Sequence, residues 1–335
     1  MRLAALGKSL RAAAGFLGAL SLALHAAVVM AFAFRWDRAA AATMVPLWLW
    51  GCAGLALALT AWLARWRRLG GVGTLVWVLT VAFCADESRP LARGWVSGSG
   101  GDWEKPPGAI RVVTVDCARR EQALAAAAAL RPDIVLMQER PPLDIRLVAD
   151  VIFGEGEGYA VGGPDCAVLS RWELAPVHAN PISLGMQARG ALPGGRYYHA
   201  LSLHLSPPPK TLALYDPAAW AAHRAARQGR RNELFSLVAM MSKTVPKGEA
   251  ALIGGQFNAP PGDAALHLLR RPGLNDAFRE AGAGWGDTFP QDLPALRLAQ
   301  IWASPDLVPL RAWVVPNPES DHRIVACDYE VRPVE

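Results

Sequence analysis

Several residues with side chains suited to chemistry lie next to apolar runs along the sequence. They are Glu139, His204, Asn258 and the adjacent pair Asp321 and His322. A carboxylate at the end of a strand can hold Mg²⁺ through one or two oxygens while water and substrate complete the octahedron. A histidine can accept or donate a proton near neutral pH, and an amide can donate hydrogen bonds to an oxyanion. These residue types together suit the metal-assisted hydrolysis of a phosphate ester.

Taken one at a time, the same residues have ordinary structural explanations. Glu139 can begin a solvated loop, and His204, among alternating apolar residues, can be a packed histidine. The Asp321-His322 pair fits a surface turn, and Asn258 before Ala-Pro-Pro can hold a turn with its side chain. Whether these residues have a catalytic or an ordinary structural role therefore depends on the order of the segments that contain them.

The elements that must position these residues occupy the second part of the chain. Strand-like apolar runs occur at 111–115, 134–137, 166–169, 198–205, 250–253, 300–303 and 323–331. Helical patterns occur at 121–130, which is rich in alanine, and at 217–241, where apolar residues recur at helical spacing. Strands with interspersed helices favour an α/β sandwich.

The N-terminal part has the composition of a membrane anchor. The chain has 335 residues, of which 52% are hydrophobic, enough for one large domain and a further element. Two to three apolar segments, at about 13–34, 44–64 and 70–86, predict transmembrane helices, the third being shorter and glycine-containing. A cleaved signal peptide is disfavoured because another apolar run follows the first. We expect an integral membrane protein in contact with the lipid bilayer.

The flanking charges predict the orientation of this anchor. Basic residues are concentrated before the first run and in 65–68, whereas the loop at 35–38 has a weaker excess. The positive-inside rule then places the N-terminus and the second loop in the cytoplasm. Three spans place the C-terminal domain outside the cytoplasm, and two spans place it inside. We expect the extracytoplasmic arrangement.

These observations divide the chain into an anchor at 1–87, a Gly/Pro/Ser linker at 88–109 and a domain at 110–335. The five cysteines have neither metal-ligand nor paired spacing and are expected to be small buried residues. The net charge of +5 does not indicate DNA binding, because much of the excess lies in the membrane flanks.

Five segments, in order, resemble the motifs of the endonuclease/exonuclease/phosphatase superfamily. They are RVVTVDCA (111–118), RPDIVLMQE (131–139), LSLHLSPP (201–208), GGQFNAPP (254–261), and the pair LRLAQIWASP (296–305) with SDHRIVACDYEV (320–331). Partial matches in the family's own order are far more specific than any single one.

The resemblance implies a fold, a cofactor and a set of site residues. The implied fold is a four-layer α/β sandwich of the DNase I-like type, with two packed β-sheets flanked by helices and an active site at one edge. The implied cofactor is Mg²⁺ or Mn²⁺, held mainly by Glu139, with Asp321 and Asp116 as further candidate ligands. The implied catalytic residues are His322, Asp321, His204, Asn258, Asp116 and Gln256.

The chain departs from the family pattern at three positions. Asp116 stands where the family has an amide, and Gln256 stands where it has an acid. If both side chains face one pocket, one acid and one amide are preserved, which suggests rearrangement, although drift in a non-catalytic descendant gives the same pattern. Ala299 replaces the Asp of an Arg-x-Asp triplet that begins at Arg297. In the family this Asp holds the imidazole, and Asp287 is another acid that could serve.

Two classes of function follow from this pattern. The first is a membrane-anchored, metal-dependent phosphoesterase acting on DNA, a phospholipid headgroup or a small phosphate ester. The second is a catalytically impaired relative that binds a phosphorylated ligand, nucleic acid or protein. Nothing in the sequence points to a specific protein partner.

Overall fold

The structure is a computed structural model that describes residues 2–97, 104–178 and 184–333. The chain divides into two compact units. The first comprises Met1–Ser88 with Pro209–Arg224, and the second comprises Arg89–Pro208 with Ala225–Glu335. The second unit contains every candidate site residue.

The first unit is built from apolar helices. They are α1 (Arg2–Phe34), the short η1 (Asp37–Ala39) and α2 (Ala40–Met44), α3 (Leu47–Leu63) and α4 (Arg67–Cys84). Among the described residues, Ala12–Phe34 and Arg67–Cys84 are each long and apolar enough to cross a membrane. Asp37–Met44 and Leu47–Leu63 meet that condition only as a pair bent by 77°. Two helices, or three with the bent pair, are therefore consistent with the expected anchor.

Small residues allow these helices to approach closely. A Cβ atom added at Gly54 of α3 would lie 1.9 Å from the Trp77 ring of α4. The Trp77 indole donates to Ser21 Oγ at 3.2 Å, and Ser21 donates to the Gly54 carbonyl at 2.8 Å. Close packing at small residues with interhelical hydrogen bonds is typical of helices in lipid.

The second unit contains two mixed sheets of six strands each. The first sheet has the order β11-β12-β1-β2-β4-β3, from β1 (Ile110–Asp116), β2 (Ile134–Gln138), β3 (Tyr159–Gly162), β4 (Ala167–Ser170), β11 (Leu307–Val315) and β12 (Ile324–Val331). The second has the order β5-β6-β7-β8-β10-β9, from β5 (Leu174–Pro176), β6 (Gly185–Ala191), β7 (Tyr197–His204), β8 (Ala250–Gln256), β9 (Asn275–Asp276) and β10 (Ala299–Ala303).

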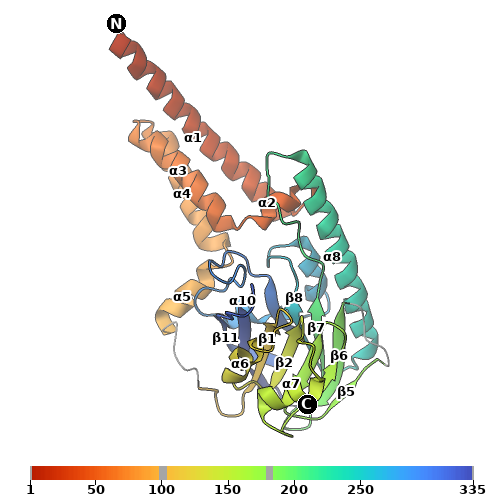
Figure 1. The fold of residues 1–335 in the computed structure, drawn as a ribbon. Helices are drawn as coiled ribbons and strands as arrows, with labels where there is room; N and C mark the ends of the chain where they lie inside the picture. The colour runs from red at the N-terminus through yellow and green to blue at the C-terminus, as the bar shows by residue number, and fades with distance from the viewer. Residues whose placement is uncertain (1, 98–103, 179–183, 334–335) are drawn as a thin grey trace. The chain divides into compact units, whose positions relative to one another are not determined.

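Helices cover the outer faces of both sheets, which confirms the four-layer sandwich (Figure 1). Helices α6 (Ala123–Ala129) and α7 (Ile145–Phe153) pack against β1 and β2, whose inward and outward residues are all buried. The later turns of α8 (Pro217–Thr244) pack through Leu234, Leu237 and Met241 against the second sheet. Between the sheets lies an apolar core that includes Leu136, Tyr198 and Ile301. Burial on both faces explains why these strands are continuous apolar runs.

Strand register places the ends of four strands together. In the parallel pairs, Asp116 of β1 lies beside Gln138 of β2, and His204 of β7 lies beside Gln256 of β8. Gln138 also donates from its side chain to Ser202 Oγ at 2.9 Å, which links the two sheets at this end. The carboxyl ends of β1, β2, β7 and β8 therefore meet at one edge.

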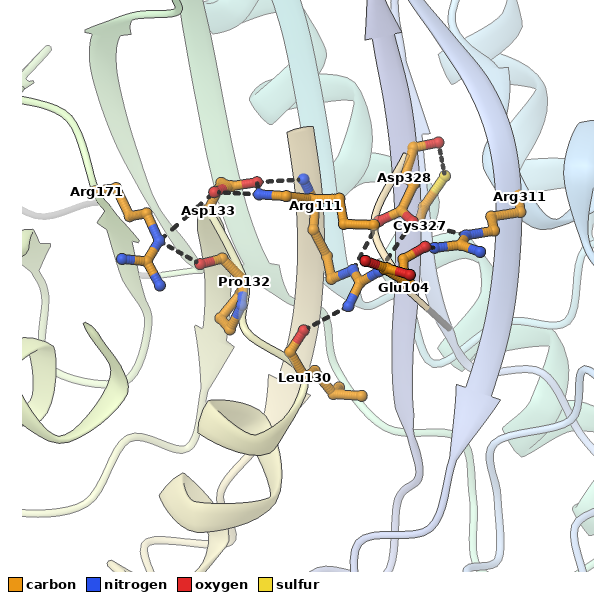
Figure 2. Close-up of polar contacts among 10 residues, drawn as sticks. Glu104, Arg111, Leu130, Pro132, Asp133, Arg171, Arg311, Cys327 and Asp328 are labelled. Carbon is orange, nitrogen blue, oxygen red and sulfur yellow. Dashed lines mark hydrogen bonds and ion pairs between the residues drawn. The ribbon is translucent and has the colours of Figure 1, made fainter. Parts of the chain in front are cut away.

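The opposite end of β1 is fixed by buried charges (Figure 2). Asp328 of β12 is fully buried and accepts hydrogen bonds from Arg111 at 2.7 and 3.0 Å and from Arg311 at 2.7 Å. Asp133 accepts from Lys105 Nζ at 2.6 Å and from the Arg111 backbone at 2.7 Å. Asp328 therefore joins β1 to its neighbour β12, and Asp133 joins β1 to the segment directly before β2.

The structure has elements that the sequence patterns did not indicate. They include α5 (Ser88–Ser97), α7, the short η2 (Ala264–Leu266), α9 (His267–Arg270) and α10 (Ala277–Ala281), and the strands β3, β5, β6, β9 and β11. Part of the expected linker at 88–109 is thus helical, and its residues 98–103 lie outside the described residues. The expected helices at 121–130 and 217–241 correspond to α6 and α8.

Candidate active site

Asp116 and Gln256 face each other across the two sheets. Gln256 Nε2 donates to Asp116 Oδ2 at 2.8 Å, and both side chains are buried. The other carboxylate oxygen, Oδ1, accepts from Ser320 Oγ at 2.8 Å and from the Ala118 backbone at 2.9 Å. Acid and amide have exchanged positions relative to the family pattern, and the two groups remain in direct contact.

His204 forms a pair with an acid that the sequence analysis did not single out. His204 Nδ1 lies 2.8 Å from Asp165 Oδ2, in the loop before β4. Because an ionised carboxylate only accepts, Nδ1 donates, and Nε2 is left for another partner. Burial lowers the pKa of His204, but the hydrogen bond to Asp165 and the negative charges of Asp165, Asp116 and Glu139 raise it more, so the net pKa is raised. The same bond lowers the pKa of Asp165.

Glu139 directly follows β2 and is half-buried at this edge. Burial raises the pKa of its carboxyl, and the negative charge of Asp116 raises it further, while the charge on His204 opposes this. Its backbone has φ 43°, a left-handed conformation that is uncommon outside glycine. Such conformations concentrate at functional sites, where the surrounding structure imposes them.

His322 is buried and Asp321 beside it is exposed. Nε2 of His322 lies 3.9 Å from Asp321 Oδ1, beyond hydrogen-bonding distance, and its ring contacts Phe289. Among the described residues no hydrogen-bond partner is present for His322 Nδ1. Burial lowers the pKa of His322 despite the nearby charges of Asp116 and Asp321, which favours a neutral imidazole at neutral pH.

Ser320 connects His322 with Asp116. Its hydroxyl donates to Asp116 Oδ1 and accepts from the His322 backbone nitrogen at 3.1 Å. The Asn317 side chain also donates to the Asp116 carbonyl, at 2.9 Å. The loop before β12 is therefore fixed to the end of β1, although the sequence offered no separate signal for Ser320.

Gln256 directly follows a position of the backbone that requires glycine, and Asn258 lies two residues further on. A Cβ atom at Gly255, where φ is 142°, would lie 2.0 Å from the Leu203 carbonyl oxygen. Asn258 has φ 52° and donates from Nδ2 to the Leu205 carbonyl at 2.6 Å. This bond ties the segment after β8 to the segment after β7, one residue beyond His204.

An open pocket of about 470 Å³ lies at this edge. Glu139, Ser320 and Asp321 line it, together with Arg120 and the loop residues Gln291 and Asp292. The exchanged pair Asp116 and Gln256 lies behind Ser320, buried from solvent. The pocket therefore has four carboxylates in its lining, Glu139, Asp292, Glu319 and Asp321, of which Glu139 and Asp321 belong to the predicted site.

The third departure from the family pattern, Ala299, lies opposite Gln256 in the register of β10 with β8. Ala299 is buried, and its backbone nitrogen donates to Thr288 Oγ1 at 3.0 Å. Arg297 forms a bidentate pair with Asp276, at 2.7 and 2.8 Å, which secures β9 to this region. Asp287 is buried in the preceding loop.

The donor set fits a hard divalent cation. No group of three His, Cys, Asp or Glu side chains that could hold a metal occurs in residues 2–97, 104–178 and 184–333. Mg²⁺ commonly takes only one or two carboxylates and keeps several waters, so Glu139 and Asp321 suffice as protein ligands. Burial, and after it the negative charge of Asp116, raises the pKa of Glu139, and a bound cation would favour its ionised form. Asp116 already uses both carboxylate oxygens in hydrogen bonds.

The fold is that of a superfamily of phosphoester hydrolases. A model of the Endonuclease/Exonuclease/phosphatase family matches residues 115–322, and the chain belongs to this family. Members are generally dependent on divalent metals.

Individual relatives have low sequence identity to this chain. The uncharacterized protein YbhP of Escherichia coli strain K12 is 27% identical over 172 residues, which cover 49% of this chain and 63% of YbhP. The match to YbhP of Shigella flexneri has the same values. The chain thus matches less than two thirds of the length of these curated relatives. A crystal structure of an endonuclease/exonuclease/phosphatase from Bacteroides vulgatus has a TM-score of 0.50 at 17% identity, with 67% of this chain and 99% of that chain covered, and it shows the same fold.

Proposed function

We propose that this protein is a membrane-anchored phosphoesterase that requires Mg²⁺ or Mn²⁺. The observation that supports it is the gathering of Asp116, Glu139 and His204 at one edge, where their charges act on one another. Three separate segments supply these residues, each from the end of a different strand. Charged and hydrogen-bonding groups that are fixed in place before the reaction can stabilise the charge that develops on phosphoryl oxygens.

His204 acts as a hydrogen-bond donor to the phosphate in this proposal. Its raised pKa favours the protonated imidazole, and Asp165 holds Nδ1 so that Nε2–H can donate to a phosphoryl oxygen. Asn258 fixes the segment beside His204 through the Leu205 carbonyl. His204, held by Asp165, presents its positive charge to an anionic substrate.

His322 acts as the proton acceptor for the attacking water. Its lowered pKa keeps it neutral near pH 7, which is the form that can accept a proton. Asp116 acts through Ser320, whose hydroxyl contacts both the carboxylate and the backbone of His322. Gln256, in the other sheet, holds the Asp116 carboxylate in place through its amide hydrogen bond.

Glu139 and Asp321 would hold the cation. When bound, Mg²⁺ or Mn²⁺ would supply Lewis-acid stabilisation of charge on the phosphate and the leaving oxygen. Phosphate esters of nucleic acid, of a lipid headgroup or of a small molecule all meet this description.

Membrane anchoring forms the second half of the proposal. The apolar helices α1 and α4, with the bent pair that includes α3, support an integral membrane protein. With three spans, the basic residues of 65–68 are cytoplasmic and the domain is extracytoplasmic. A C-terminal alkaline phosphatase fusion is then active and a green fluorescent protein fusion dark. The opposite pair of results would mean that α4 does not span.

A binding module is the alternative, and two observations favour it. Ala299 supplies no orienting carboxylate for His322, and both oxygens of Asp116 are already hydrogen-bonded. Such a site could retain affinity for phosphate while losing turnover.

An activity screen separates the two functions. The full chain in detergent is assayed with Mg²⁺ or Mn²⁺ on a DNA oligonucleotide, phospholipid micelles and a chromogenic phosphate ester. The enzyme hypothesis expects turnover that is lost on chelation and in His322→Ala, but is retained in His267→Ala, an exposed histidine outside the pocket. A folded protein with no turnover above the His322→Ala level, but with phosphate binding, identifies a binding module.

A further inference from the structure

Helix α5 has two distinct faces. Pro90 and Gly94 are buried and Arg93 is partly buried, whereas Leu91 is 41% exposed and Trp95 is 92% exposed. Residues four apart in a helix lie on the same side, so Leu91 and Trp95 form one apolar patch. We call this pair the α5 apolar face.

The inner face of α5 is fixed to α10 and to the segment that follows α10. Arg93 donates to the carbonyls of Phe278, Arg279, Glu280 and Gly282, at 2.7 to 3.3 Å. The carbonyls of Arg279, Glu280 and Gly282 lie at the C-terminus of α10, where a helix leaves its last acceptors without intrahelical partners, while the Phe278 carbonyl also accepts from the Gly282 nitrogen at 2.7 Å. One guanidinium therefore satisfies the end of α10 and fixes α5 to it.

Backbone contact reinforces this attachment. The Gly284 nitrogen donates to the Pro90 carbonyl at 2.9 Å. A Cβ atom at Gly94 would lie 2.5 Å from the Gly284 nitrogen, so α5 and the segment after α10 are in direct backbone contact. The α5 apolar face cannot turn inward without breaking these contacts and those of Arg93.

The position of α5 in the chain identifies what covers its apolar face. Only Ala85, Asp86 and Glu87 separate the end of α4 from the start of α5. Four residue steps span at most about 14 Å. If α4 crosses a bilayer, α5 therefore begins at or near its headgroup layer. Tryptophan is enriched in this layer, where its ring is buried and its N–H remains hydrated.

We propose that the α5 apolar face lies in the interfacial layer of the lipid bilayer, so that the phosphoesterase unit has its own membrane contact in addition to the spanning helices. This proposal rests on the membrane anchoring in the proposed function. It does not depend on turnover or on the identity of the substrate.

The test uses fluorescent labels on the full chain in phosphatidylcholine vesicles. Cys52 and Cys84 are first replaced by serine, because they are exposed, contrary to the expectation that all five cysteines are buried; Cys117, Cys166 and Cys327 are buried as expected. An environment-sensitive label is then attached at Trp95→Cys or Leu91→Cys. Matched labels are placed at Leu75→Cys, exposed within α4, and at Val151→Cys, exposed on α7 of the second unit. Nitroxide lipids report depth by quenching.

The proposal expects labels at 91 and 95 to be quenched roughly twofold or more by a headgroup nitroxide, and less by a mid-chain nitroxide, as befits an interfacial site. The label at 151 should remain unquenched. If the label at 75 is quenched while those at 91 and 95 behave like 151, this inference is overturned and the anchor stands. If the label at 75 is also unquenched, the anchor itself fails.

Two further outcomes remain distinct. Labels at 91 and 95 that are shielded from water but not quenched by lipid, and that become exposed when the protein is diluted in lipid, would assign the face to a second copy and overturn the proposal. Phosphoesterase turnover measured on the same vesicles reports the chemistry independently of all these labels.

Discussion

The amide of Gln256, at the end of β8, donates to the carboxylate of Asp116, at the end of β1, at 2.8 Å. This contact joins the two sheets at the candidate site, and it pairs the two positions at which the chain exchanges acid and amide relative to its family. An exchange between side chains in contact can preserve the local charge and hydrogen bond. The contact is consistent with rearrangement of a working site, and it makes the rearrangement testable.

Reversing the exchange should restore activity that the first step removes. Asp116→Asn leaves two amides in contact and should lower kcat/KM by on the order of 10²-fold, within the range for a group that supports acid–base catalysis. Asp116→Asn with Gln256→Asp should recover most of it, because one acid and one amide are present again. Steady-state kinetics of the three proteins, with thermal unfolding as the check on folding, measure this. Additive losses in the double variant would contradict it.

Adding Ala299→Asp to that double variant should raise the rate further. Thr288 joins position 299 to the His322 segment, since its Oγ1 accepts from the Ala299 nitrogen and its carbonyl accepts from the Arg323 nitrogen at 2.8 Å. A carboxylate there can orient the imidazole, and roughly a tenfold gain is expected because such effects are not additive. Ala299→Asn is the matched control, and an equal gain from it would exclude charge as the cause.

Glu139→Gln should abolish binding of Mg²⁺ or Mn²⁺ to the full chain in detergent, because it removes the half-buried carboxylate that would hold the cation. Glu155→Gln, at an exposed position, should bind as the parent does. Isothermal titration calorimetry measures both. Identical titrations for the parent and Glu139→Gln would exclude Glu139 as the main ligand.

The same substitution has a second readout without metal. A carboxyl with a raised folded-state pKa destabilises the folded protein once the pH exceeds that pKa, so Glu139 costs stability at neutral pH. In chelator, Glu139→Gln should therefore raise the free energy of unfolding, by less than about 1 kcal/mol because solvent screens the half-buried carboxylate. A decrease would mean that the charge is already compensated within the protein.

The pH profile of kcat/KM should be bell-shaped, with each limb assigned to one histidine. The pKa of His322 is lowered by burial, so the acid limb should lie below the ordinary histidine value of about 6.5. The pKa of His204 is raised, so the alkaline limb should lie above it. Asp165→Asn removes the contribution that most raises the pKa of His204, and it should move only the alkaline limb to lower pH. Asp144→Asn, an exposed helix cap, should move neither limb.

Asp328→Ala should strongly destabilise the protein. Asp328 is fully buried between Arg111 and Arg311, and breaking a buried ion pair by removing one partner costs about 3–5 kcal/mol. Glu319→Gln removes the partly exposed partner of Arg120 in a surface ion pair and should cost no more than about 1 kcal/mol. Chemical denaturation, followed through the unfolding transition of the second unit, compares the free energies of unfolding of the two variants. Similar losses would show that the cluster in Figure 2 adds no more than a surface pair.

The sequence predicted β1, β2, β4, β7, β8, β10 and β12, which appear as apolar or β-branched runs, and it missed β3, β5, β6, β9 and β11. β1, β2 and β8 are buried on both faces and appear as continuous runs. β11 contains Pro309 next to a register shift at the sheet edge, where proline is tolerated, and its sequence therefore lacks a clear strand pattern. β6, with glycine at both Gly185 and Gly190, is hidden for a similar reason.

The site was predictable where residues belong to contiguous motifs. Glu139 and Asn258 follow strands within such motifs, and their roles stay predictions. Asp165 could not be found, because it lies 39 residues from His204 and only the packing of the loop before β4 brings the two together. Likewise, Arg93 lies in a segment with the composition of a linker, while its partners lie 185 to 189 residues further along.

Strand β1 has the buried charges of Arg111 near its first residue and Asp116 at its last, which strand geometry separates by roughly 16 Å. Substitutions more than about 10 Å apart with no shared partners are nearly additive in their effects on stability. Evolution can therefore exchange the residues at the reactive end of this strand with little effect on the charge cluster that anchors the other end. A single strand in this way gives the protein room to change its chemistry while keeping its architecture.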